Sequence, residues 1–493
     1  MSNQDQDPKN QEIVENRALN IWEALIPIFA LVGMLAYNVL VFGDDALSGS
    51  NQFILLLGAA VAALVGFFNK TSFETMMEEV AQNIKSTAGA ILILLMVGAL
   101  AGTWLVSGII PTMIYYGLQI LNPSIFLAAC VVICAIISVA TGSSWTTSAT
   151  VGIALIGIAN ALGISLGMTA GAILSGAYFG DKLSPLSDTT NLAPAMAGTD
   201  LFTHIQYMLF TTVPTVSITL IVFIIIGLNI ETSGTADTSA ILASIDDAFT
   251  ISPWLFIVPA IVIFMIIKKT PPLIALLIGT ILGGIAALIF QPEIIAGLGG
   301  SESLTFESGY KGIMNAITVD TAIETTNENL NDLFAASGMA GMLGTIWLIL
   351  CAMTFGGVMD AIGALSRISA FMLDLFESTF GLFASTVATC IGLNATASDQ
   401  YLAIVVPGKM YAKAYKDKGL APENLSRTLE DSGTVTSVLV PYNTCGAYQS
   451  GVLGVSVADY FVYAIFNWLS PFMTLIFAAF RIKIRTLKEA KAA

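Results

Sequence analysis

The chain has 493 residues, of which 56% are hydrophobic and only 11% are charged, and its mean hydropathy is +0.82. A soluble protein carries about 25% charged residues, so the composition excludes a soluble globular enzyme and indicates a polytopic membrane protein. The net charge is −15, and we expect the lipid bilayer, and no nucleic acid, as the partner of its surface.

Apolar segments follow one another along the whole chain. Those at 22–42, 87–107, 203–228 and 459–480 are each long enough to cross a bilayer as a helix. Shorter ones lie at 52–68, 123–140, 145–162, 166–180, 254–268, 271–290, 338–358, 379–393, 399–412 and 427–440. Lipid cannot satisfy an open strand edge, so every span should be helical. The sequence therefore predicts an all-α polytopic membrane protein with about 12–14 transmembrane segments, several of them broken or re-entrant.

Lysine and arginine set the orientation of the spans, because short loops rich in them stay in the cytoplasm. The C-terminal end is basic, whereas the linker 229–253 has no Lys or Arg. We expect a cytoplasmic N-terminal tail at 1–21, a first transmembrane repeat at 22–228, an extracytoplasmic linker at 229–253, a second repeat at 254–480 with an extracytoplasmic insertion at 291–337, and a basic cytoplasmic tail at 481–493. Both termini are thus predicted to lie in the cytoplasm.

Two polar interruptions of the apolar segments match one another at a fixed offset. The run TGSS at 141–144 interrupts one segment, and TASD at 396–399 interrupts another (396 − 141 = 255). The pairs Asp188-Thr189 and Asn443-Thr444 fall at the same offset, which indicates a duplicated unit. The first unit enters from the cytoplasmic side near residue 87, and its copy enters from outside near residue 342. We therefore expect inverted-topology repeats, which are a common basis of alternating access.

The run GDKLSPLSDTTN at 180–191 combines carboxylate, hydroxyl and amide oxygens between two apolar segments. Hard cations take several oxygen ligands, as calcium and magnesium do, and sodium should behave likewise. Asp181, Asp188, Thr189 and Asn191 are therefore candidate ion ligands. The alternative is an ordinary polar loop in which Asp188 caps the next helix.

The two helix breaks and the copy of the 180–191 run supply further oxygens. The full set of candidate ion- and proton-binding residues is Asp188, Asp399, Asp181, Thr189, Asn191, Ser143, Ser144, Asn394, Thr396, Ser398, Asn443, Thr444 and Asp431. Among them, Asp188, Thr189, Asp399 and Asn443 are the candidate metal ligands. Two alternatives stay open: the hydroxyls can bond carbonyls of their own helix, and Asp431, with Glu430, can cap the helix that follows Pro422.

One buried carboxyl can couple two ion fluxes. Burial disfavours its charged form, so it holds a proton until a sodium ion takes the proton's place. If the empty charged site cannot reorient, only the loaded forms cross the membrane. Asp188 and Asp399, one from each half, are the first candidates for this role, and Asp181 and Asp431 follow. The enzyme motif HExxH is absent, and we expect no catalytic residue and no cofactor.

The runs at 180–191, 141–147 (TGSSWTT) and 394–399 (NATASD) resemble the NhaC family of sodium/proton antiporters, and the resemblance covers roughly residues 20–480. It implies a carrier of the ion-transporter superfamily in the bacterial inner membrane that exchanges Na⁺ for H⁺. Some similar proteins exchange organic acids, such as malate for lactate, so a sodium- and proton-coupled carboxylate antiporter stays open, as does an amino-acid antiporter. A carboxylate site would need a cation, for which Lys182 and Lys409 are the candidates. A homodimer is also left open.

Overall fold

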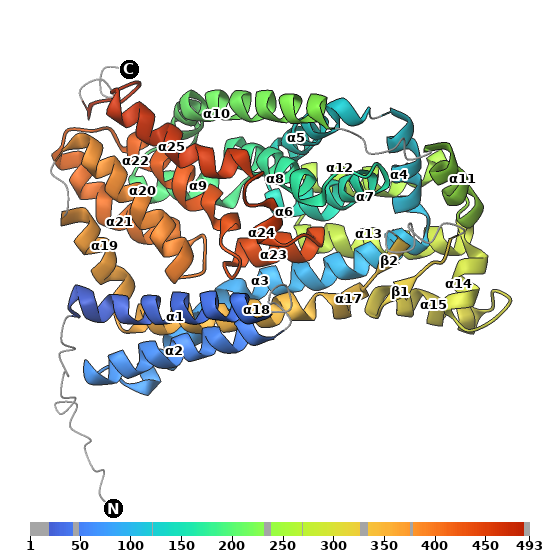
Figure 1. Ribbon diagram of the computed structural model, residues 1–493, viewed down its shortest axis with the longest axis horizontal. Coiled ribbons are helices and arrows are strands. Elements are labelled where there is room, and N and C mark those ends of the chain that lie inside the picture. Colours follow the sequence, from blue (N-terminus) through green and yellow to red (C-terminus); the bar gives the residue numbers. More distant parts are fainter. Residues whose placement is uncertain are drawn as a thin grey trace, which may run out of the picture.

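The computed structural model describes residues 19–42, 49–120, 122–230, 238–268, 270–325, 334–374 and 378–487. These residues are almost entirely helical, and the long helices run side by side along the long axis of the molecule (Figure 1). One short antiparallel pairing joins β1 (Thr321–Ala322) to β2 (Ala335–Ala336). Most of the predicted tail 1–21, part of the linker, part of the insertion and the last residues of the basic tail lie outside the described residues.

Eight helices of the described part are long and apolar enough to cross a membrane. They are α1 (Ile21–Phe42), α2 (Ser50–Phe68), α3 (Phe73–Val106), α5 (Pro123–Thr141), α10 (Leu201–Asn229), α13 (Pro272–Phe290), the continuous stretch of α17 (Gly338–Gly341) and α18 (Leu343–Ala361), and α20 (Thr379–Thr396). A ninth candidate is the pair formed by α11 and the following η3 and α12, which is bent by 84°. The predicted all-α multi-pass class is confirmed.

In the described part of the chain, eight of the predicted 12–14 segments are full-length spans, or nine with the bent pair, and the others form helices that are short or interrupted. The shorter helices of the site region are α4 (Ile109–Ile120), α6 (Ser144–Thr147), η2 (Ser148–Gly152), α7 (Ile153–Ala161), α8 (Leu166–Leu183), α9 (Asp188–Ala197), α19 (Ala364–Asp374), α21 (Leu402–Asp417), α22 (Pro422–Leu429), η5 (Glu430–Thr434), η6 (Ser437–Leu439), α23 (Thr444–Leu453), α24 (Val457–Tyr460) and α25 (Ile465–Ala479). Hydropathy detects each apolar segment, but glycines and polar residues inside the segments divide them into shorter helices.

The predicted linker and insertion contain helices of their own. They are α11 (Thr238–Ala248), η3 (Pro253–Phe256) and α12 (Ile257–Ile267) around the linker, and α14 (Pro292–Leu298) and α15 (Phe306–Thr318) in the insertion. Ile241 and Ile245, one helical turn apart on α11, are both buried. An amphipathic stripe of this kind buries one side of a helix against its neighbours, so α11 packs on the bundle, although its 11 residues are too few to span a membrane alone.

The sequence repeat is also a repeat of helices. Helix α3 ends at Val106 and α18 ends at Ala361, while α5 ends at Thr141 and α20 ends at Thr396, so both pairs of ends are 255 residues apart. The turn after the first helix of each pair has a glycine in the left-handed region, with φ of 80° at Gly108 and 76° at Gly363. Such a turn is cheap for glycine and costly for other residues, which explains why both copies keep it.

Helices α5 and α8 pack directly against each other because α8 carries small residues on the face it shows to α5. A Cβ placed on Gly176 would lie 2.2 Å from the carbonyl oxygen of Val131, and one on Gly180 would lie 2.5 Å from that of Ala135. Ser138 donates a hydrogen bond of 2.6 Å to the carbonyl of Ala177 across the same interface. Small residues four apart are a common device for close helix packing in membranes.

Replacing Gly180 with valine should lower the stability of the protein by about 1–3 kcal/mol, the usual cost of overpacking a filled interior. The new side chain would meet Ala135 and Ser138 within 2.5 Å. Thermal unfolding of the purified protein in detergent measures the effect. Gly392→Ala on α20 is the control, since no atom lies within 4 Å of a Cβ there. Equal unfolding temperatures for the two variants would contradict the proposed packing.

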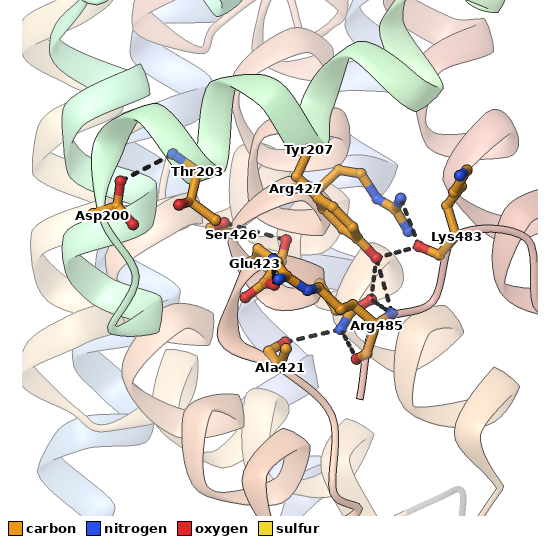
Figure 2. A network of polar contacts seen from close by, with 10 residues as sticks. Asp200, Thr203, Tyr207, Ala421, Glu423, Ser426, Arg427, Lys483 and Arg485 are labelled. Atoms are coloured by element: carbon orange, nitrogen blue, oxygen red, sulfur yellow. Dashed lines mark hydrogen bonds and ion pairs between the residues drawn. The ribbon is translucent and has the colours of Figure 1, made fainter. Parts of the chain in front are cut away.

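The segment after α25 is held against α22 and α10 by a polar network (Figure 2). Asn424 donates to the carbonyl of Arg485 over 2.7 Å, and the Tyr207 hydroxyl donates to Asn424 Oδ1 over 2.7 Å. The guanidinium of Arg485 pairs with Glu423 at 2.9 Å, and the fully buried Arg427 lies over the Tyr207 ring, 4.6 Å from its centroid. The network therefore joins the C-terminal segment to the helix that leads into η5.

Tyr207→Phe should loosen this C-terminal segment while it keeps the ring. The change removes the hydroxyl that contacts Asn424, the Lys483 carbonyl and the Arg485 amide, and leaving such buried partners unsatisfied costs about 1–3 kcal/mol. Trypsin cleavage at Lys483 and Arg485 should become faster. Tyr310→Phe, at a position that is 62% exposed, should leave the cleavage rate unchanged, and an unchanged rate for Tyr207→Phe would contradict the anchoring role.

Candidate functional site

A cavity of about 420 Å³ lies between the helix break at 142–143, the α8–α9 loop and the break at 397–401. Its lining residues come from both halves of the chain: Ser86, Gly89, Ala90, Ile93, Thr141, Gly142, Ser143, Trp145, Thr146, Asp181, Leu186, Ser187, Asp188, Thr189, Ile266, Thr270, Pro271, Pro272, Gln400 and Tyr401. Two carboxylates are among them, and the described lining contains no Lys, Arg or His. The cavity is therefore acidic.

The first helix break is organised around Asp181. Helix α5 ends at Thr141 and is capped by Gly142, whose φ is 71°, and Ser143 caps the short helix α6 by accepting from the Thr146 amide over 3.1 Å. Ser144 then donates two hydrogen bonds to Asp181 Oδ2, from its amide over 3.1 Å and from its hydroxyl over 2.6 Å. Asp181 is only 7% exposed and lines the cavity, so α8 presents a nearly buried carboxylate at the break.

The α8–α9 loop places Asp188 in the first turn of α9. Ser187, and not Asp188, caps this helix by accepting from the Thr190 amide over 3.5 Å. The Asp188 side chain is exposed and lines the cavity beside the buried Thr189. Asn191 is exposed and donates to the carbonyls of Pro185 and Ser187, so its amide nitrogen holds the loop in shape. The capping role that was the alternative for Asp188 therefore belongs to Ser187.

The second helix break keeps its carboxylate behind the lining. Ser398 has a φ of 57°, which is a strained conformation for a residue other than glycine. Asp399 is 4% exposed, and its Oδ1 accepts from the Leu402 amide over 3.0 Å at the start of α21. Gln400 and Tyr401, rather than Asp399, reach the cavity. Tyr401 lies within electrostatic range of both Asp188 and Asp399, the two carboxylates that the sequence singles out.

The loop before α23 is hydrogen-bonded to the second helix break. It occupies the position in the second repeat that the α8–α9 loop occupies beside the first break. Asn443 caps α23, accepting from the Cys445 amide over 3.0 Å, and donates to the Asn394 carbonyl over 3.0 Å. The Thr444 amide donates to the Ser398 carbonyl over 3.0 Å. Asn394 itself donates to the Gly433 carbonyl over 2.7 Å and to the Thr436 hydroxyl over 3.0 Å. These residues are therefore brought together beside the cavity rather than in its lining.

Some hydroxyls of the breaks satisfy their own helix and others do not. Thr147 and Thr150 donate to carbonyls four residues earlier, over 2.9 and 2.7 Å. In contrast, the buried hydroxyls of Thr141, Thr396 and Ser398 have no hydrogen-bond partner among the described residues. Thr141 and Thr396 occupy the same position of the two repeats. Buried polar groups normally find a partner, so these oxygens are available to a ligand.

Asp431 lies in a different environment from the other candidates. It forms an ion pair with Lys182, and both side chains are fully buried. Asp431 also accepts from the hydroxyls of Ser470, over 3.3 Å, and Thr474. It lies at the start of the π-helix η5, well past the N-cap of α22. The cap role is therefore wrong for Asp431, and the ion pair occupies its carboxylate.

Sequence reasoning missed Gln400 and Tyr401 as lining residues, and it gave Lys182 and Glu430 other roles, as the cation of a carboxylate site and as a helix cap. Gln400 and Tyr401 directly follow the second break, and a longer window around TASD could have included them. Lys182 is instead paired with Asp431, which comes from the other half of the chain. Within the described residues, no three His, Cys, Asp or Glu side chains form a metal cluster. Of the candidate metal ligands, Asp188 and Thr189 line the cavity, and Asp399 and Asn443 lie behind the second break.

A helical multi-pass protein with an acidic cavity between broken helices from two halves of the chain is a secondary transporter in class. The chain belongs to the Na⁺/H⁺ antiporter family, whose family model matches residues 176–482. It is therefore a secondary antiporter of the NhaC type and not an enzyme, as the sequence predicts.

Similar proteins with curated functions span several substrates. The Na⁺/H⁺ antiporter NhaC of Alkalihalophilus pseudofirmus is 37% identical over 86% of this chain and 88% of its own length. The malate-2H⁺/Na⁺-lactate antiporter of Bacillus subtilis is 37% identical over 85% of this chain and 86% of its own. The arginine/ornithine antiporter ArcD of Halobacterium salinarum is 32% identical over 92% and 90%. Overall identity therefore shows the family without selecting the substrate.

Proposed function

We propose that the protein exchanges Na⁺ for H⁺ across the inner membrane of a bacterium. The observation that carries the proposal is the negative charge of the cavity. Asp181 and Asp188 line it, and its described lining residues include no Lys, Arg or His. Ionisable groups at membrane depth usually mark the path of the solute. Carboxylate and hydroxyl oxygens, supplied here also by Ser143 and Thr189, are the ligands that hard cations prefer.

A dicarboxylate substrate is less well served by this cavity. Lys182, one of the two cations that the sequence offers for it, is paired with Asp431 and does not line the cavity. Lys409, the other, is exposed on α21 and is also absent from the lining. A dicarboxylate would face two like charges without a partner, which is unfavourable in a partly dry site.

A cationic amino acid is the second candidate substrate. The cavity volume of about 420 Å³ lies within the range of small-molecule sites, about 300–1,000 Å³, and exceeds what a bare Na⁺ requires. The acidic lining would suit an arginine-like side chain, and Trp145 and Tyr401 offer aromatic faces for it. This candidate is tested alongside sodium.

Coupling of the two ions follows from competition at Asp181. The carboxyl is 7% exposed, so it is costly to leave it charged and empty when the cavity closes. A proton neutralises it, or a sodium ion bound with Ser144 and the nearby oxygens does so. Only the loaded forms then change conformation, and the two repeats, inserted in opposite directions, open the cavity to one side at a time.

The cavity is expected to face the cytoplasm in the conformation described. Its lining includes Ile266 and Thr270–Pro272 at the turn between α12 and α13, and Lys268 in this turn marks a cytoplasmic end by the positive-inside rule. In Figure 1, α1 begins and α25 ends at the same end of the bundle. This arrangement supports the expectation that both termini are cytoplasmic.

Proteoliposomes that contain the purified protein and a pH-sensitive dye test the proposal. A pH gradient is imposed, and Na⁺, K⁺, arginine, malate or lactate is added to separate samples. The dye reports which of these solutes collapses the gradient. Collapse by Na⁺ alone is the expected result. Collapse by malate or lactate without any response to Na⁺ would overturn the proposal, and a response to arginine alone would establish the second candidate.

A further inference from the structure

Glu430 is a fully buried carboxyl group that the exchange mechanism at Asp181 does not use. It is the first residue of the π-helix η5 and has an exposed fraction of 0%. Neither of its carboxylate oxygens has a hydrogen-bond partner among the described residues, and the buried hydroxyl of Thr434 on the same π-helix is likewise unpartnered. Such a group is rare in a folded protein, which points to a role beyond packing.

The charged groups that face Glu430 come from both repeats. Lys182 and Asp181 from α8 act on it, as does its neighbour Asp431. Lys182 and Asp431 already form an ion pair, so their charges largely offset one another. Two further helices packed on η5 carry charged residues: α22 has the buried Arg427, whose guanidinium lies over the Tyr207 and Phe477 rings, and α9 begins at the exposed Asp188. The groups that contact η5 from the remaining helices are uncharged: Asn467, Ser470 and Thr474 from α25, Asn394 and the thiol Cys390 from α20, and the backbone of Ala403 from α21.

The protonation of Glu430 is decided by the cost of a bare charge. An ionised carboxylate without hydrogen bonds in a dry interior costs several kcal/mol, even after the protein relaxes, whereas the neutral acid buries only a polar group. We propose that Glu430 is a second proton-binding residue of the transport cycle, which holds a proton in this conformation and releases it when the repeats rearrange. This inference rests on the proposed Na⁺/H⁺ exchange.

A proton fits this position better than a sodium ion. One carboxylate and the Thr434 hydroxyl supply too few oxygens for a hard cation. When Glu430 loses its proton, the O–H bond breaks, the proton passes to water, and the remaining anion is stabilised by water and by the Lys182 ammonium. Asp181 and Lys182 are consecutive on α8, so one helix contacts both the cavity and the Glu430 region.

The π-helix gives the site a means to change. A π-helix carries an extra residue in a helical turn and often occurs at functional sites. Here it covers residues 430–434 and follows α22 directly. A shift of this turn during the exchange of conformations would move Glu430 relative to Lys182 and expose it to water. The geometry thus couples proton release at Glu430 to the movement that alternating access requires.

The test compares wild type with Glu430→Gln in proteoliposomes. The number of protons exchanged per Na⁺ is obtained from the membrane potential and ion gradients at which net flux stops. We expect Glu430→Gln to exchange one proton fewer per Na⁺ than wild type, and Glu430→Asp to restore the wild-type ratio. Glu307→Gln, at an exposed carboxyl paired with Lys311, is the matched control and should change nothing. An unchanged ratio and pH dependence in Glu430→Gln would overturn the proposal.

A second measurement separates this inference from the proposed function. If wild type moves no Na⁺ against H⁺, the exchange proposal fails, and infrared spectroscopy of the purified protein near neutral pH still tests Glu430. The C=O stretching band of a protonated carboxyl in apolar surroundings should be present in wild type and lost in Glu430→Gln. If that variant does not fold, Glu430→Asp should shift the band. Identical bands in wild type and the folded variant would show that Glu430 carries no proton.

Discussion

Replacing Asp181 with asparagine should lower Na⁺/H⁺ exchange by about 100-fold or more at a fixed, low Na⁺ concentration. A carboxylate about 4 Å from a sodium ion contributes roughly 4 kcal/mol at an effective dielectric constant near 20, and an amide offers neither that charge nor a site for the transported proton. Asp181 is nearly buried, lines the cavity and accepts two hydrogen bonds from Ser144. Uptake of radioactive sodium into proteoliposomes under a pH gradient measures the loss.

Asp188→Asn and Asp399→Asn are the informative comparisons. Asp188 lines the cavity but is exposed, so water screens its charge and we expect a smaller loss, mainly in the apparent affinity for Na⁺. Asp399 lies behind the lining and binds the Leu402 amide, so its change should affect the shape of the second break. Full exchange in Asp181→Asn, together with its abolition in Asp188→Asn or Asp399→Asn, would transfer the coupling role to the latter residues.

The sequence predicts the architecture well because hydropathy and repeat spacing are local properties of the chain. The apolar segment at 123–140 corresponds to α5 (Pro123–Thr141), and the segment at 271–290 corresponds to α13 (Pro272–Phe290). The polar runs TGSS and TASD fall at the ends of α5 and α20, where a glycine or a residue in the left-handed region stops the helix. The positions of the two breaks, and the polar residues at them, therefore follow from the pattern of residues alone.

The arrangement of side chains around the breaks depends on helix rotation, which the sequence does not encode locally. Asp181 and Lys182 are neighbours in sequence, yet one faces Ser144 and the other faces Asp431, because successive residues on a helix point about 100° apart. The repeat spacing favours Asp188 over Asp181 as the buried carboxylate, whereas Asp181 is nearly buried and Asp188 is exposed. Spacing also cannot show that Glu430, next to a well-bonded Asp431, has no hydrogen-bond partner of its own among the described residues.

Lys182→Met should be the most destabilising single change in the site region. The ammonium and the Asp431 carboxylate are both fully buried and form an ion pair, and removal of one member leaves the other charge uncompensated. The usual cost is about 3–5 kcal/mol. Ser470 and Thr474 would still donate to Asp431, but neutral donors only partly replace a cation. The unfolding temperature in detergent should fall accordingly, whereas Lys311→Met, in an exposed pair with Glu307, should change stability by less than about 1 kcal/mol.

The double variant Lys182→Met/Asp431→Leu tells a structural ion pair from a working one. Replacement of a buried pair by apolar residues of similar volume is often neutral for stability, so the double variant should recover most of the stability that Lys182→Met loses. Exchange should nevertheless stay impaired, because Lys182 is the cation that acts on Glu430 and its loss leaves a deprotonated Glu430 without a counter-charge. If the double variant has wild-type stability and wild-type exchange, the Lys182–Asp431 pair has only a structural role, that of holding the two repeats together.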